Sequence, residues 1–125
     1  MTHNIERVFI TGANGFIGQA VAAFLNKKGI ETCGIDFVAN PDANVIAADL
    51  FAVDIWKELL KDSDAVLHTA AVVSNALSEE ETWRVNVQGT QLVMDAASAS
   101  SRTRRFIHLS SVAALGFEHE GVMDE

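Results

Sequence analysis

The fold is decided by the stretch TGANGFIG, residues 11–18. It follows a short apolar run at 7–11, typical of a buried strand, and it opens a segment at 16–28 with helical periodicity. In that context Gly12 permits a tight turn, Gly15 lets the backbone approach a pyrophosphate, and Gly18 lets helix and strand pack closely. The free N–H groups at the helix start would face the anion. The stretch therefore predicts a dinucleotide-binding turn; glycines that serve a turn alone are the alternative.

Strand and helix patterns alternate along the rest of the chain. A capping box, Ser78 with Glu81 three residues later, predicts the start of a long helix. This alternation indicates parallel strands joined by helical crossovers, hence a doubly wound α/β sheet. The predicted strands are 7–11, 31–36, 44–48, 65–68 and 105–109, the helices 16–28, 55–60 and 78–101, with a turn at 39–43 and irregular structure at 110–125.

Several apolar and histidine positions are expected in the core. His68 and His108 lie in predicted buried strands, where we expect structural roles, and Cys33 is expected to be a small core residue. The helix at 16–28 is expected to bury one stripe, made of Ile17, Ala20, Val21, Phe24 and Leu25.

Composition limits the class of protein. With 125 residues, 49 % of them apolar, the chain is expected to form one domain, residues 1–125, rather than a disordered segment. The single cysteine excludes a disulfide framework and a multi-cysteine zinc site, and we expect no metal. A net charge of −8 argues against a nucleic-acid partner. No apolar run long enough for a membrane span and no secretory signal are found, so a cytoplasmic protein is expected.

An acidic residue follows the glycine motif at the expected distance. Asp36 lies 18 residues beyond Gly18, at the end of the second predicted strand. A carboxylate there accepts hydrogen bonds from the adenosine ribose and repels a 2′-phosphate. The next residue is Phe37, where an NADP site would favour arginine. The pair predicts a preference for NAD over NADP; an acidic turn residue is the alternative for Asp36.

Five ordered motifs over nearly the whole chain resemble the extended branch of the short-chain dehydrogenase/reductase superfamily, the branch of NAD-dependent epimerases and dehydratases. They are the glycine stretch at 11–18, the Asp-hydrophobic pair at 49–50, HTAA at 68–71, NVQGT at 86–90 and LSSVAALG at 109–116. The resemblance implies a Rossmann sheet of about five strands in the order 3-2-1-4-5. It also implies that the chain is the cofactor-binding part of a longer protein, truncated before the later strands and the substrate-binding part.

The resemblance assigns roles to individual residues. Asp49 could instead cap the following helix, Asn86 could make a simple buried hydrogen bond, and Ser110 and Ser111 could be ordinary strand-end residues. Ser111 stands at the catalytic serine position of the family. The cofactor-binding residues expected from the motifs are Gly12, Asn14, Gly15, Phe16, Ile17, Gly18, Asp36, Phe37, Asp49, Leu50, Thr69, Ala70, Ala71, Asn86 and Ser110.

One departure from the family limits the chemistry. The family's general base is the tyrosine of a Tyr-x-x-x-Lys pair beyond the serine, and this chain contains no tyrosine. We therefore expect the chain to be inactive alone, although the full-length protein would be an NAD-dependent oxidoreductase or epimerase/dehydratase. It would act by hydride transfer on a hydroxyl or carbonyl group of a sugar nucleotide or similar small molecule. A homodimer or other self-association is expected. The alternative is a non-catalytic NAD-sensing regulator or scaffold of the same superfamily.

Overall fold

The computed structural model describes residues 4–72 and 77–110, in which five parallel strands form one sheet. Its order is β3-β2-β1-β4-β5, as predicted, and every pairing between neighbours is parallel. The chain therefore builds the sheet outward from β1 to β3 and then crosses to the other side of β1 for β4. The strands are β1 (Arg7–Thr11), β2 (Glu31–Asp36), β3 (Val45–Ala47), β4 (Ala65–His68) and β5 (Arg105–His108).

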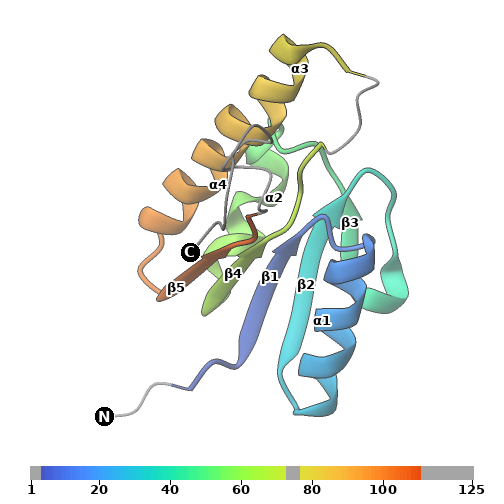
Figure 1. Ribbon diagram of the computed structural model, residues 1–125. Helices are drawn as coiled ribbons and strands as arrows, with labels where there is room; N and C mark the ends of the chain where they lie inside the picture. The colour runs from blue at the N-terminus through green and yellow to red at the C-terminus, as the bar shows by residue number, and fades with distance from the viewer. Residues whose placement is uncertain (1–3, 73–76, 111–125) are drawn as a thin grey trace, which may run out of the picture.

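Helices cover both faces of the sheet (Figure 1). The helical elements are α1 (Phe16–Lys27), the 3₁₀ turn η1 (Pro41–Ala43), α2 (Val53–Lys61), α3 (Glu79–Trp83), η2 (Arg84–Gln88) and α4 (Gly89–Ser98). The predicted capping box is confirmed, because the Ser78 hydroxyl accepts a hydrogen bond from the Glu81 N–H at 3.2 Å. The long helix predicted at 78–101 is not uniform: η2 is a π-helical turn between α3 and α4. A π turn inside an α-helix frequently marks a functional site.

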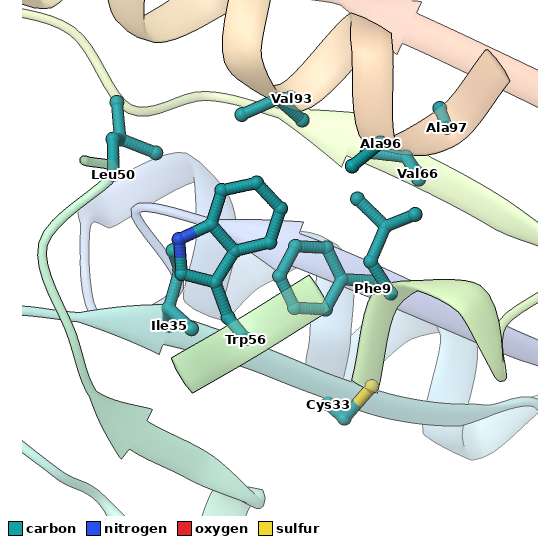
Figure 2. Packing of buried hydrophobic residues seen from close by; sticks show 10 residues of the cluster. Phe9, Cys33, Ile35, Leu50, Trp56, Val66, Val93, Ala96 and Ala97 are labelled. Carbon is teal, nitrogen blue, oxygen red and sulfur yellow. The ribbon is translucent and has the colours of Figure 1, made fainter. Parts of the chain in front are cut away.

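The larger core lies between the sheet and the helices α2 and α4. Figure 2 shows Trp56 of α2 beside Phe9 of β1, with Val66 of β4 and Val93 of α4 around them. The two aromatic rings stack with centroids 5.9 Å apart, and both side chains are fully buried. Cys33 is buried in the same core, as predicted. No helix in the described part of the chain is both long and apolar enough to cross a membrane.

The helix α1 covers the opposite face, but its buried stripe differs from the predicted one. Gly18 is the buried residue of α1, and a Cβ there would lie only 2.5 Å from the carbonyl oxygen of Gly12, in the turn that follows β1. Two large apolar residues of the predicted stripe, Phe24 (58 % exposed) and Ile17 (43 %), are exposed instead. Of the predicted stripe, Val21 and Leu25 are half-buried, whereas Ile17, Ala20 and Phe24 are exposed.

The prediction that His108 is buried was wrong. Its strand, β5, is the edge of the sheet within the described residues, with β4 as its partner. Of its residues, only Phe106 is half-buried, while Ile107 and His108 are exposed. His68, in contrast, is fully buried on β4 between two neighbouring strands. The same strand pattern thus has different burial at the centre and at the edge of a sheet.

Candidate cofactor site

A pocket of about 540 Å³ opens at the carboxyl ends of β1, β2 and β4. This is the point at which the strand order reverses, where open α/β sheets bind their ligands. The structure brings most of the sequence-predicted cofactor residues together here. The predicted residues that line the pocket are Gly12, Gly15, Phe16, Ile17, Gly18, Asp36, Phe37, Asp49, Leu50, Thr69, Ala70 and Ala71.

The glycine turn is shaped by close backbone approach. Gly12 has a positive φ of 66°, and a Cβ there would lie 2.8 Å from the Thr69 hydroxyl. Gly15 is the N-cap of α1 with an ordinary φ of −71°, and a Cβ on it would contact only the Gly12 carbonyl oxygen, at 3.2 Å. No side chain caps α1, whose first intrahelical bond runs from the Gln19 N–H to Gly15. The start of the helix therefore presents its backbone N–H groups toward the pocket, as an anionic group requires.

The Asp36 carboxylate is held by two backbone N–H groups. Its Oδ2 accepts a hydrogen bond from the Asn14 N–H at 2.9 Å, and its Oδ1 accepts one from the Phe37 N–H at 2.8 Å. A carboxylate oxygen accepts more than one bond, so both oxygens keep acceptor capacity for a ligand. Asn14 itself does not line the pocket; its side-chain amide donates to the Val38 carbonyl at 2.7 Å. Asn14 thus connects the glycine turn to the segment that carries Asp36.

Asp49 and Leu50 form the wall of the pocket that follows β3. The Asp49 carboxylate accepts a hydrogen bond from the Phe51 N–H at 2.8 Å, whereas the N-cap of α2 is Ala52. The alternative that Asp49 caps this helix is therefore not what the structure has. Phe51 also lines the pocket, and the Arg84 guanidinium lies 3.7 Å from the centre of its ring. Neither Phe51 nor Arg84 belongs to a sequence motif, so neither was predicted as a site residue.

The segment after β4 is bound on both sides. The Thr11 hydroxyl accepts hydrogen bonds from the Thr69 and Ala70 N–H groups, each at 3.1 Å. The Asn86 side chain makes two bonds to the Val72 backbone, accepting from its N–H at 2.7 Å and donating to its carbonyl at 2.9 Å. Asn86 lies outside the pocket lining, so the structure supports the simple hydrogen-bonding role that the sequence left open for it.

His68 lies behind this segment, fully buried. Its Nδ1 lies 2.6 Å from the Thr11 hydroxyl oxygen and its Nε2 2.8 Å from that of Thr90. Burial, with a smaller contribution from the charge of His108, lowers the pKa of His68 from 6.5 to about 4. The imidazole is therefore neutral at pH 7. The structural role expected for His68 agrees with these contacts.

Some predicted site residues lie outside the pocket, and some lining residues were not predicted. Ser110 is exposed and not part of the lining, and Ser111 lies outside the described residues. Lining residues without a sequence prediction are Ile35, Ala48, Phe51, Val72, Leu77, Val85 and Leu109. All are apolar except for their backbone groups, and most are adjacent to a motif residue, which is the one signal that could have found them. Within 4–72 and 77–110, no three His, Cys, Asp or Glu side chains form a group that could hold a metal.

Comparisons with known proteins agree with this geometry. The model of the NAD dependent epimerase/dehydratase family matches residues 8–125. The 4-hydroxy-2-methyl-3-oxo-4-farnesyl-3,4-dihydroquinoline-1-oxide ketoreductase of Stigmatella aurantiaca is 30 % identical over an alignment of 116 residues, and the match covers 87 % of this chain and 34 % of that protein. The chain thus spans about a third of that relative's length.

Two solved structures share the fold. A short-chain dehydrogenase/reductase superfamily protein of Agrobacterium tumefaciens with bound NAD matches with a TM-score of 0.75 and 32 % identity, over 84 % of this chain and 32 % of that one. MoeE5 in complex with UDP-glucuronic acid and NAD matches with a TM-score of 0.81 and 30 % identity, over 94 % and 40 %. The glycine turn, the sheet order and the family match lead to one conclusion: the chain belongs to the NAD-dependent epimerase/dehydratase family of the short-chain dehydrogenase/reductase superfamily.

Proposed function

We propose that this chain binds NAD and is the cofactor-binding part of an enzyme that transfers hydride at a hydroxyl or carbonyl carbon of a sugar nucleotide or similar small molecule. The observation that carries the proposal is the meeting of the glycine turn and Asp36 at one pocket. The turn leaves room for a pyrophosphate beside the uncapped start of α1, and Asp36 offers two preset carboxylate oxygens to a ribose. NAD would supply the hydride acceptor.

The residues present fit NAD better than NADP. Asp36 is the carboxylate that lines the pocket at the end of β2, and its neighbour is Phe37 rather than a cation. A 2′-phosphate placed near Asp36 would meet a like charge, whereas ribose hydroxyls would donate to it. The apolar side chains of Leu50 and Phe51 provide a surface for the adenine ring. NAD in the two solved structures named above supports the same choice of cofactor.

The substrate class and the catalytic step rest on the family. UDP-glucuronic acid in the MoeE5 complex supports a sugar nucleotide as the substrate of the full-length protein. In this proposal Ser111 donates a hydrogen bond to the reacting oxygen. The chain contains no tyrosine, so the family's general base is not among these 125 residues. General acid–base help is worth about 10²–10⁴-fold, and we expect no measurable turnover from this chain alone.

The experiment is a calorimetric titration of the chain with NAD and with NADP. We expect NAD to bind more tightly, and Asp36→Asn to weaken NAD binding roughly 10- to 100-fold, because hydrogen bonds to a charged group contribute about 1.5–3 kcal/mol. Asp42→Asn is the matched control, since Asp42 is an exposed carboxylate on η1 and does not line the pocket. Equal affinities for the two cofactors in the wild type would refute the ribose assignment of Asp36.

A further inference from the structure

Three side chains, the fully buried Thr11 and His68 and the half-buried Thr90, connect the segment beside the cofactor pocket to the long helix. Thr11 at the end of β1 contacts His68 of β4 through Nδ1 at 2.6 Å, and His68 contacts Thr90 of α4 through Nε2 at 2.8 Å. The Thr90 hydroxyl in turn lies 2.7 Å from the Asn86 carbonyl oxygen. None of Thr11, His68 and Thr90 lines the pocket, so a role for them must act through other residues.

The direction of each hydrogen bond follows from counting donors at the Thr11 end. The Thr11 hydroxyl oxygen accepts hydrogen bonds from the Ala70 N–H and the Thr69 N–H. The Thr69 N–H also bonds to the Thr11 carbonyl oxygen. A hydroxyl has two acceptor lone pairs and one proton. With both lone pairs in use, the hydroxyl proton remains for His68, so Nδ1 must be the acceptor.

The Thr90 end requires the same tautomer independently. The Asn86 carbonyl can only accept, so the Thr90 hydroxyl donates to it. The remaining partner, Nε2 of His68, must then be the donor toward the Thr90 oxygen. Both ends therefore place the imidazole proton on Nε2, and the three residues form a hydrogen-bond chain with a single direction.

We propose that His68, as the neutral Nε2–H tautomer, is a positioning residue that holds the Thr69 and Ala70 backbone in place for the cofactor through Thr11. This inference rests on the proposed function, because it concerns the wall of the same pocket. Thr69 and Ala70 both line that pocket, and Ala70 N would lie only 3.0 Å from a Cβ at Gly12. A displacement of this segment would therefore change the space beside the glycine turn.

One stretch of helix holds both ends of the segment 69–72. Asn86 lies within η2 and binds Val72, whereas Thr90, four residues later, supports Thr69 and Ala70 through His68 and Thr11. Residues four apart on a helix point to the same side. The segment 69–72 is thus attached at its beginning and at its end to the same stretch of helix.

Protonation of His68 would break this arrangement. An imidazolium carries a proton on both nitrogens, and Nδ1–H would then face an oxygen whose lone pairs are already used by Thr69 and Ala70. The neighbouring groups from three elements carry no negative charge that could stabilise an imidazolium. They are the hydroxyls of Thr11 on β1 and Thr90 on α4, and the ring of Phe106 on β5, whose centroid lies 6.2 Å from that of His68. His108 of β5 is a titratable neighbour, with its ring stacked on that of His68 at 5.4 Å between centroids, and a protonated His108 would add a like charge. These surroundings agree with the lowered pKa of His68.

The first test uses two substitutions at Thr11. Thr11→Val keeps the shape of the side chain but removes the hydroxyl, whereas Thr11→Ser keeps the hydroxyl. We expect the dissociation constant for NAD to rise about tenfold or more in Thr11→Val, and to stay within about twofold in Thr11→Ser. Thr32→Val is the control, because Thr32 is also buried on a strand but its hydroxyl bonds to Asn26, away from this segment. Normal NAD binding by a folded Thr11→Val would overturn the inference and leave the proposed function standing.

The second test needs no cofactor and therefore separates the two proposals. Nitrogen NMR of the His68 ring in the cofactor-free chain should show Nε2 protonated and Nδ1 unprotonated between pH 8 and pH 5. An Nδ1–H tautomer, or an imidazolium at pH 6, would overturn the inference. Amide exchange at Thr69 and Ala70 should become faster in Thr11→Val and stay slow in Thr11→Ser. A wild-type chain with the expected tautomer that binds no NAD would instead refute the proposed function, and with it the role of His68 toward the cofactor.

Discussion

Gly15 and Gly18 provide a sharp test, because a side chain at Gly18 should lower stability, whereas one at Gly15 should block NAD binding. In Gly18→Ala, the new Cβ would lie 2.5 Å from the Gly12 carbonyl oxygen and 3.0 Å from Ala13 Cα, both backbone atoms that cannot rotate away. In Gly15→Val, the Cβ would meet only that same carbonyl oxygen, at 3.2 Å, and would otherwise point into the open pocket.

The expected magnitudes follow from these contacts. Overpacking in Gly18→Ala costs about 1–3 kcal/mol, and the better helix propensity of alanine offsets roughly 0.5–1 kcal/mol of it. A net loss of about 1–2 kcal/mol in the free energy of unfolding is expected. Gly15 has an ordinary φ and lies at the exposed N-cap, so Gly15→Val should lose less than about 1 kcal/mol. Its branched side chain should nevertheless abolish NAD binding, because it occupies the space in front of the helix start.

The assay pairs urea unfolding, followed by far-ultraviolet circular dichroism, with calorimetric titration of NAD. Gly18→Ala should shift the unfolding midpoint, whereas Gly15→Val should unfold close to the wild type and show no heat of NAD binding. If Gly15→Val lost as much stability as Gly18→Ala, the inference that Gly18 is tightly packed and Gly15 is not would be wrong. If it bound NAD normally, the assignment of a pyrophosphate to this turn would be wrong.

Three further predictions concern acid stability, the adenine side of the pocket, and assembly. Because the folded pKa of His68, about 4, lies below the unfolded value of 6.5, the free energy of unfolding should fall as pH drops from 6.5 toward 4, by about 3 kcal/mol in total. In His68→Gln, the free energy of unfolding should change less over this pH range. Identical pH profiles of the wild type and the variant would refute the prediction. Gly89→Ala would place a Cβ 2.8 Å from Cδ1 of Leu50, a pocket residue, and Leu50 would have to shift. We therefore expect weaker NAD binding by calorimetry with little change in stability, and an unchanged affinity for NAD would contradict this prediction. Trp83 and Val87 are exposed on the long helix, so the chain should self-associate in a dilution series measured by light scattering. Trp83→Glu should self-associate less. A wild-type chain that stays monomeric at high concentration would contradict this prediction.

Much of the fold could be predicted because the relevant signals are local. Four of the strands begin at the predicted residue, and the third, predicted at 44–48, is β3 at 45–47. Apolar periodicity and turn residues act over a few neighbours, which is why they survive in a single sequence. The burial of particular side chains could not be predicted in the same way. Phe24 has the spacing of a core residue and is 58 % exposed, because burial also depends on which parts of the folded chain pack against the helix.

The candidate site, too, could be predicted only in part. The motif residues could be found because glycine and aspartate at strand ends have few local explanations other than a turn or a ligand. Phe51, Leu77 and Val85 line the pocket but have the side chains of ordinary core residues, and only the position of Phe51 and Val85 next to a motif residue marks any of them in the sequence. The π turn was missed as well, since the apolar spacing of the long helix continues across it. Only the structure shows that Asn86, within this turn, binds Val72.

The sequence by itself thus determined the parallel α/β fold, the dinucleotide turn and the position of Asp36, because backbone freedom at glycine and side-chain periodicity are properties of adjacent residues. Only the tertiary structure decided which atoms these residues bind. The contact between Thr11 and His68 joins residues 57 apart in the chain, and that between Asn14 and Asp36 joins residues 22 apart. Such contacts exist only once the sheet has formed. The tautomer of His68 and the orientation of the Asp36 carboxylate therefore depend on packing that no local pattern records.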